Sequence, residues 1–163
     1  MARQLKPGDK APDFCLPNEV GQTVSLKSLK GKPIVLYFYP KDDTPGCTKE
    51  ACHFRDAAFL VKTRVVVLGV SLDGAESHRK FIAKYGLPFS LLTDEDAAVS
   101  KNYGVFVQKN MYGRKYWGIE RSTFVIDHIG AIQAIFRKVK VEGHVEAVQA
   151  VLQQESLSAD AGS

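Results

Sequence analysis

The sequence predicts one α/β domain, spanning residues 1–163, with a central mixed β-sheet flanked by helices. Two continuous apolar segments, residues 34–39 (IVLYFY) and 65–70 (VVVLGV), have the composition of strands buried on both faces. Apolar residues recur at helical spacing between them. The chain is 45% apolar over 163 residues, which is enough for one domain with a substantial core.

The N-terminal part predicts a small hairpin. Residues 14–16 and 23–26 are short candidate strands on either side of a polar turn at residues 18–22. Cys15 alternates with Phe14 and Leu16, and we expect it to be a small buried core residue. The alternative for Cys15 is a role as partner for another, oxidised cysteine.

The middle of the chain predicts a βαβ unit. Phe54, Ala58 and Val61 recur at helical spacing between the two apolar segments. Strand, helix and strand within about forty residues form such a unit, and its crossover is expected to be right-handed.

The pattern then repeats more loosely. A helix is predicted over residues 75–85, with Phe81, Ile82 and Tyr85 facing inward, and a short strand and helix over 89–92 and 97–103. Residues 122–126 and 131–139 read as strands joined by a turn at 127–130, and residues 144–153 as the last helix. The small, polar residues 155–163 are expected to fray. Together these elements predict a thioredoxin-like arrangement.

Charge and cysteine content exclude several classes of protein. The net charge is +4 and the basic residues are scattered, which favours a solvated surface over a nucleic-acid interface. The N-terminus lacks a signal-peptide core, and no apolar run approaches the ~20 residues that span a bilayer. Three cysteines, an odd number, fit a reducing compartment, so we expect a cytoplasmic protein without a membrane partner. The four histidines are isolated and are expected to lie on the surface or at caps.

Residues 40–54 (PKDDTPGCTKEACHF) carry the chemistry. They leave the end of a buried strand and open a helix, where sites of α/β proteins commonly lie. Thr44 is a preferred N-cap residue and Pro45 suits the first helical position, so Cys47 falls in the first turn. Unpaired N–H groups and the helix dipole favour the thiolate there, which makes Cys47 a candidate nucleophile. The alternative is an inert buried thiol.

The five-residue spacing from Cys47 to Cys52 limits what the pair can do. It is neither a C-x-x-C redox pair nor half of a zinc site, and His53 has no second ligand pair with which to complete four ligands. On an ideal helix the two Cα atoms are ~8–9 Å apart. A disulfide needs ~7 Å or less, so we predict that this bond forms only after the first turns unwind.

These residues resemble a known family. Pro40, Thr44 and Cys47 match the P-x-x-x-T-x-x-C signature of peroxiredoxins. The longer T-P-G-C-T-x-E-A-C at residues 44–52 is similar to the subgroup called peroxiredoxin Q or bacterioferritin comigratory protein, as are residues 8–14 and 118–127. The resemblance covers roughly residues 5–153.

The resemblance implies a thioredoxin fold and the reduction of hydrogen peroxide and organic hydroperoxides, without a metal or organic cofactor. It implies that Cys47 is the peroxidatic cysteine, that Cys52 is the resolving cysteine, and that thioredoxin or a similar dithiol is the reductant. A monomer is the expected state, with a dimer as the alternative. The residues implied to surround the peroxide are Pro40, Thr44, Gly46, Cys47 and Arg121.

Arg121 suits this role physically, because it starts a predicted strand from which a guanidinium can approach Cys47 and polarise the peroxide. A surface ion pair is the alternative for Arg121. Glu50 matches the acidic position of the family and can orient an arginine; the alternative is a solvated helix residue.

Two other functions are compatible with a cysteine pair. One is a thiol–disulfide oxidoreductase acting on protein disulfides, which an insulin-reduction assay separates from a peroxidase. The other is a non-catalytic redox sensor or holdase, whose cysteines would oxidise at rates near those of a free thiol. The pairing of Thr44 with Arg121 favours the peroxidase, because a sensor disulfide needs no peroxide clamp.

Overall fold

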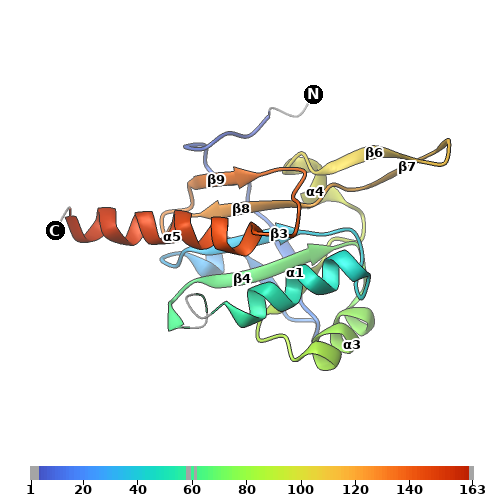
Figure 1. Ribbon diagram of the computed structural model, residues 1–163, viewed down its shortest axis with the longest axis horizontal. Helices are drawn as coiled ribbons and strands as arrows, with labels where there is room; N and C mark the ends of the chain where they lie inside the picture. Colours follow the sequence, from blue (N-terminus) through green and yellow to red (C-terminus); the bar gives the residue numbers. More distant parts are fainter. Residues whose placement is uncertain (1–3, 58–59, 61, 162–163) are drawn as a thin grey trace.

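The computed structural model describes residues 4–57, 60 and 62–161 and centres on a five-stranded sheet (Figure 1). Across the sheet the strands are β5 (Ser90–Thr93), β4 (Val66–Ser71), β3 (Ile34–Phe38), β8 (Ser122–Ile126) and β9 (Ile132–Phe136). The pairs β3–β4 and β4–β5 are parallel, whereas β8 is antiparallel to both β3 and β9. The sheet is therefore mixed, as predicted.

The central strand β3 is buried on both faces, because alternate residues enter two separate cores. Ile34, Leu36 and Phe38 pack in one core, and Val35 and Tyr37 pack in the other. A continuous apolar run is the pattern that such a strand requires.

Helices cover both faces of the sheet. The face with Val35 and Tyr37 packs against α1 (Pro45–Asp56), α3 (Ala75–Tyr85) and α5 (His144–Ala161). Figure 1 shows α1 and α5 side by side on this face. The other face packs against α4 (Ala98–Asn102) and the N-terminal segment.

The main elements predicted from sequence are confirmed. The final helix continues to Ala161, beyond the predicted end at residue 153, consistent with the Gln, Glu, Leu and Ala in this stretch. The helix after β3 ends at Asp56, and Ala58 and Val61 lie outside the described residues.

None of the helices in the described ranges combines the length and apolar character needed to cross a membrane.

The predicted N-terminal hairpin consists of β1 (Cys15–Pro17) and β2 (Thr23–Ser25). The prediction that Cys15 is buried is wrong, because Cys15 is exposed. Its neighbours Phe14 and Leu16 point into the core, and strand alternation then turns Cys15 to the opposite, open face of a two-stranded sheet.

A second hairpin, formed by β6 (Phe106–Met111) and β7 (Arg114–Ile119), was not predicted from the sequence. Its two-residue turn has positive φ angles, 53° at Tyr112 and 79° at Gly113. This is the turn type that joins tight hairpins, but Asn or Asp usually precedes the glycine. Because Tyr112 precedes Gly113, the usual sequence signal for this turn is absent.

Candidate active site

Cys47 is the third residue of α1 and is only 1% exposed. The predicted N-cap position of Thr44 is confirmed, since its backbone is extended and α1 begins at Pro45. The hydroxyl does not cap the helix, however. It donates to the Lys41 carbonyl at 2.9 Å. The side chain thus leaves the N–H groups of the first turn available to the Cys47 sulfur or to a substrate oxygen.

The Arg121 guanidinium contacts the cysteine directly. Arg121 lies in the two-residue connection between β7 and β8, and its Nη2 donates to Cys47 Sγ at 3.3 Å. Its Nη1 donates to Glu50 Oε1 at 2.7 Å. The fork of one guanidinium therefore joins the sulfur and a carboxylate, and such a cation favours the thiolate. The alternative of a surface ion pair does not fit Arg121.

Glu50 is fully buried in α1, which rules out a solvated helix residue. Burial raises the pKa of Glu50 to about 7, and the charge and hydrogen bond of Arg121 act in the opposite direction. Among the described residues, Oε2 of Glu50 has no hydrogen-bond partner. Glu50 thus fixes the guanidinium through one oxygen.

Gly46 makes room for Arg121. A Cβ atom at this position would lie 3.1 Å from Nη2 and 3.8 Å from Cζ of Arg121. The missing side chain lets the guanidinium lie against the first turn of α1. Pro40, at the start of the loop before the helix, is half-buried.

A buried polar network that was not predicted holds the loop at residues 40–44. The Asp42 carboxylate accepts hydrogen bonds from the Tyr39 hydroxyl at 2.5 Å and the Ser77 hydroxyl at 2.8 Å, and it pairs with His78 Nδ1 at 2.7 Å. The Asp42 N–H donates to Asp73 Oδ2 at 2.8 Å. These contacts tie the loop to α3 and to the end of β4.

His78 is fully buried, so the expectation of a surface histidine is wrong for this residue. Its Nδ1 faces Asp42, and its Nε2 lies 3.1 Å from the Leu92 carbonyl oxygen. Both ring nitrogens of His78 therefore have a polar partner inside the core. The sequence placed Asp42 in the loop before Cys47, but it gave no indication that Asp42 pairs with His78, which lies 36 residues away.

His144 is also buried, at the start of α5, against the expectation. Its Nε2 lies 2.7 Å from the Thr123 hydroxyl. Burial, followed by the charge of Arg121, lowers the pKa of His144 to about 4. His144 is therefore neutral at pH 7 and adds no positive charge near Arg121.

Cys52 lies half-buried in α1, and both Cys47 and Cys52 are free thiols. The helix is continuous over Pro45–Asp56. The two cysteines are thus held at the spacing of an intact helix, which is too long for a disulfide.

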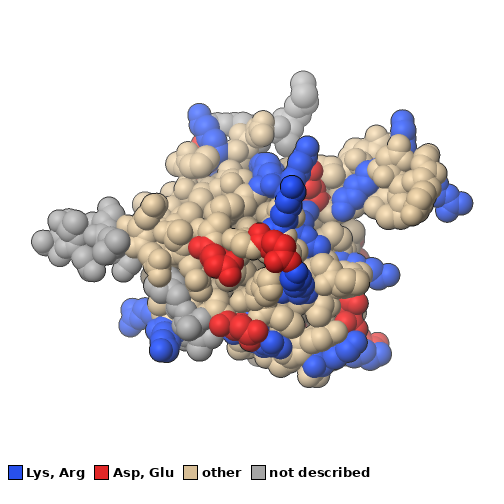
Figure 2. Space-filling model, viewed as in Figure 1, with Lys and Arg blue, Asp and Glu red and all other residues tan. Residues whose placement is uncertain are grey.

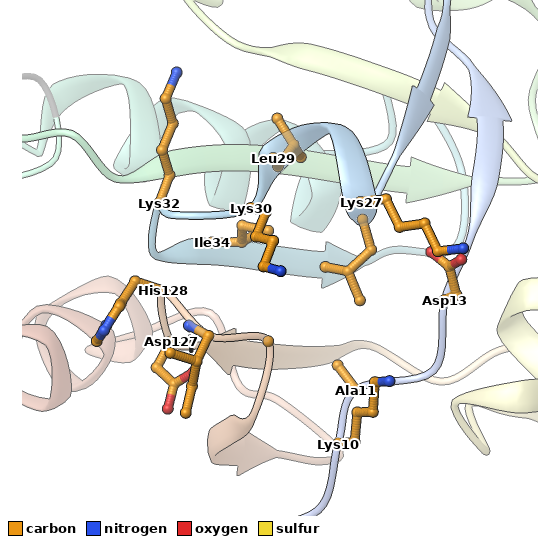
Figure 3. Close-up of a pocket in the computed structure, with 13 residues that line it drawn as sticks. Lys10, Ala11, Asp13, Lys27, Leu29, Lys30, Lys32, Ile34, Asp127 and His128 are labelled. Carbon is orange, nitrogen blue, oxygen red and sulfur yellow. Dashed lines mark hydrogen bonds between the residues drawn. The ribbon is translucent and has the colours of Figure 1, made fainter.

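A cavity of about 440 Å³ lies at the other end of β3 (Figure 3). Ile34, the first residue of β3, and the turn after β8 contribute to its wall, whereas Cys47 follows the last residue of β3. It contains none of the predicted site residues. The basic side chains around the cavity are Lys10, Lys27, Lys30, Lys32 and His128.

In the described part of the chain, no group of three or more His, Cys, Asp or Glu side chains is placed to hold a metal ion.

Comparisons with known proteins agree with this geometry. The sequence pattern of the AhpC/TSA family matches residues 7–135. The chain is 57% identical over 145 residues to a putative peroxiredoxin bcp of Coxiella burnetii, covering 88% of this chain and 96% of that protein. It is 51% identical over 144 residues to peroxiredoxin Bcp of Bacillus subtilis, covering 87% and 92%.

Solved structures give the same result. The bacterioferritin comigratory protein of Xanthomonas campestris, in a study of its alkyl peroxide reduction activity, superimposes with a TM-score of 0.85 at 39% identity, covering 92% of this chain and 99% of that one. PrxQ of Xylella fastidiosa gives a TM-score of 0.85 at 36% identity, covering 94% and 99%. The chain therefore belongs to the AhpC/TSA family, in its peroxiredoxin Q or bacterioferritin comigratory protein group, and is a thiol-dependent peroxidase.

Proposed function

We propose that Cys47 is the peroxidatic residue of this enzyme and that it reduces hydrogen peroxide and organic hydroperoxides. The Cys47 thiolate attacks one peroxide oxygen, the O–O bond breaks, and the leaving oxygen takes a proton to give water or an alcohol. The cysteine becomes a sulfenic acid. The observation that carries the proposal is the 3.3 Å contact between Arg121 Nη2 and the Cys47 sulfur.

Arg121 and the N–H of Cys47 supply donors for the two peroxide oxygens, and the Thr44 hydroxyl adds one when it turns from the Lys41 carbonyl to the peroxide. Charge grows on both oxygens as the bond breaks, and donors fixed in advance stabilise that charge without reorganisation. The pair with Glu50 supports the fixed position of the guanidinium, at 2.7 Å. Pro40 and Gly46 complete the wall, and Gly46 does so by leaving space for Arg121.

Cys52 is the resolving cysteine in this proposal. Its thiol condenses with the sulfenic acid, a disulfide forms, and water leaves. Because the intact helix holds the Cα atoms ~8–9 Å apart, the first turns of α1 unwind before the bond forms. An external dithiol, thioredoxin or a similar protein, then reduces the disulfide.

We also propose that the protein works as a monomer in the cytoplasm. Three free cysteines, at positions 15, 47 and 52, are compatible with a reducing compartment. Sedimentation of the reduced and oxidised protein tests the oligomeric state.

Three serine variants test the assignment. Cys47→Ser should abolish peroxidase turnover, and Cys52→Ser should spare the first oxidation in stopped-flow but block efficient recycling by thioredoxin. Cys15→Ser, a change at an exposed cysteine, is the matched control and should keep both steps. Full turnover in Cys47→Ser would refute the proposal, and normal thioredoxin recycling in Cys52→Ser would refute the resolving role.

A further inference from the structure

The β6–β7 hairpin extends from the body of the protein and carries most of its exposed large apolar side chains (Figure 1). Six such side chains are exposed in the described part of the chain, and four of them lie within residues 111–117. A concentration of this kind marks an interaction surface rather than the scattered exposure that is normal for a monomer. The four are Met111, Tyr112, Tyr116 and Trp117.

The same hairpin is basic. Residues 106–119 contain Lys109, Arg114 and Lys115 and no Asp or Glu. Figure 2 shows this projection with Lys and Arg but no acidic side chain on the visible face. A partner of this surface is therefore expected to be acidic.

The hairpin is also continuous with the site. Its second strand ends at Ile119, and Arg121 follows two residues later. Lys109 is half-buried, and its stem lies beside Gly118. The charge of Lys109 interacts with Arg121, Glu120 and Cys47. The base of the hairpin therefore adjoins the site.

The composition favours a protein over a lipid surface. Met, Tyr, Trp and Arg are the residues enriched at protein–protein interfaces. The apolar part of the tip consists of Met111 and Tyr112 alone, because Asn110, Arg114 and Lys115 flank them directly, and this leaves little apolar surface to insert into lipid. A desolvated aromatic centre with a basic rim fits a protein partner.

We propose that residues 106–119 form the docking surface for an acidic protein dithiol that reduces the Cys47–Cys52 disulfide. This inference rests on the proposed function. In the step, one thiolate of the partner attacks a sulfur of the disulfide, and its second thiol resolves the mixed disulfide. Two electrons and two protons pass to Cys47 and Cys52, and the partner leaves as a disulfide.

The test compares recycling by reduced thioredoxin with recycling by dithiothreitol, which needs no docking surface. The variants are Trp117→Ser with Met111→Ser, and Arg114→Glu with Lys115→Glu. Ile129→Ser, at an exposed apolar residue in the turn after β8, is the matched control. We expect kcat/KM for thioredoxin to fall by about tenfold or more in both double variants, because interface anchors commonly cost that much. The charge variant should also lose its salt dependence.

The rate constant of Cys47 oxidation by peroxide and the recycling by dithiothreitol should stay at the values of the unmodified protein in all variants. The proposal is overturned if thioredoxin recycles both double variants normally, or if dithiothreitol recycling falls equally. Self-association or binding to phosphatidylglycerol vesicles that both double variants abolish, with thioredoxin recycling unchanged, would assign the surface to another occupant. Failure of the peroxide step in the unmodified protein would instead refute the proposed function.

Discussion

The loop at residues 40–44 and the first two turns of α1 adjoin in sequence but are held in different ways. The loop is fixed by Asp42, whose carboxylate contacts Tyr39, just after β3, and Ser77 and His78 in α3. The helix that follows has no side-chain cap at Thr44 and no acidic residue in its first turn, and Cys52 is only half-buried. The loop is anchored by buried polar contacts, whereas the helix start has a proline at its first position but neither a side-chain cap nor an acidic first turn.

This difference fits the two demands of the proposed cycle. Peroxide reduction needs donors at fixed positions, whereas disulfide formation needs the helix to open. Anchoring the loop while the helix start carries no side-chain cap lets the turn with Cys47 open after the peroxide has reacted, while the loop at residues 40–44 stays in place.

Removing the loop anchor is expected to have the largest effect. Asp42→Asn removes the carboxylate charge from its buried pair with His78 and weakens the contacts with Tyr39 and Ser77. Breaking a buried pair on one side costs about 3–5 kcal/mol. We expect a loss of that size in the free energy of unfolding, measured with urea at pH 7.

The neighbouring Asp43→Asn is the matched control for this change. Asp43 is exposed and pairs with Lys84 at 2.8 Å. Its φ of 56° suits Asn as well as Asp, and an exposed ion pair contributes little to stability. Equal losses in the two variants would show that the Asp42 network is not a special anchor.

Replacing the guanidinium of Arg121 is expected to have the second largest effect. In Arg121→Lys the charge remains, but one ammonium cannot reproduce the separate contacts of Nη1 with Glu50 and Nη2 with Cys47. The loss of a preorganised donor commonly lowers a rate by about 10²–10³. Stopped-flow oxidation of Cys47 should show this decrease. Arg137→Lys, a change away from the cysteine, should leave the rate within about twofold of the original; a similar fall there would contradict the role of Arg121.

The elements that form by local patterns were predictable from the sequence. The apolar run of β3, the helical spacing in α3 and the turn after β8 each have a short-range signal, and each element is present. The β6–β7 hairpin was missed, because the residue before Gly113 is a tyrosine that adopts a positive φ. Cys15 was misplaced because strand alternation was noted but its outward side was not assigned.

Predicting the candidate site was possible where its residues share one segment. Thr44, Cys47, Glu50 and Cys52 all lie in α1 or at its start, and helix geometry relates them. The contact of Arg121 with Cys47 crosses 74 residues and was expected only through the family resemblance. The pair of Asp42 with His78 had no such guide, since no pattern in a single sequence reports which buried groups meet.

The third prediction concerns how the free energy of unfolding depends on pH through Glu50. Its folded pKa of about 7 lies above the ordinary 4.5, so the folded protein binds more protons between these values. Its contribution to stability is therefore present below pH 4.5 and is lost as pH rises to 7, by about 3 kcal/mol. In Glu50→Gln this loss is absent. The free energy of unfolding of the variant, minus that of the original protein, should rise by that amount between pH 4.5 and 7.

The comparison of variant and original cancels His144, which titrates in both. Glu95→Gln removes one exposed carboxylate and serves as the matched control. A difference for Glu50→Gln that is flat with pH would show that the carboxylate stays ionised throughout and is held by Arg121 alone.

The smallest expected effect concerns the opening of the helix itself. Oxidation to the Cys47–Cys52 disulfide should lower hydrogen-exchange protection of residues 45–53 by about tenfold or more, equivalent to ~1.4 kcal/mol of local stability. The amides of Tyr39 and Asp42, which donate to Val70 O and Asp73 Oδ2, should keep their protection, because the anchor does not open. Cys52→Ser, which cannot form the bond, should show no change on treatment with one equivalent of peroxide. Equal protection of residues 45–53 in the reduced and oxidised protein would mean that the disulfide forms without unwinding, and then the weak capping of α1 would have no part in the cycle.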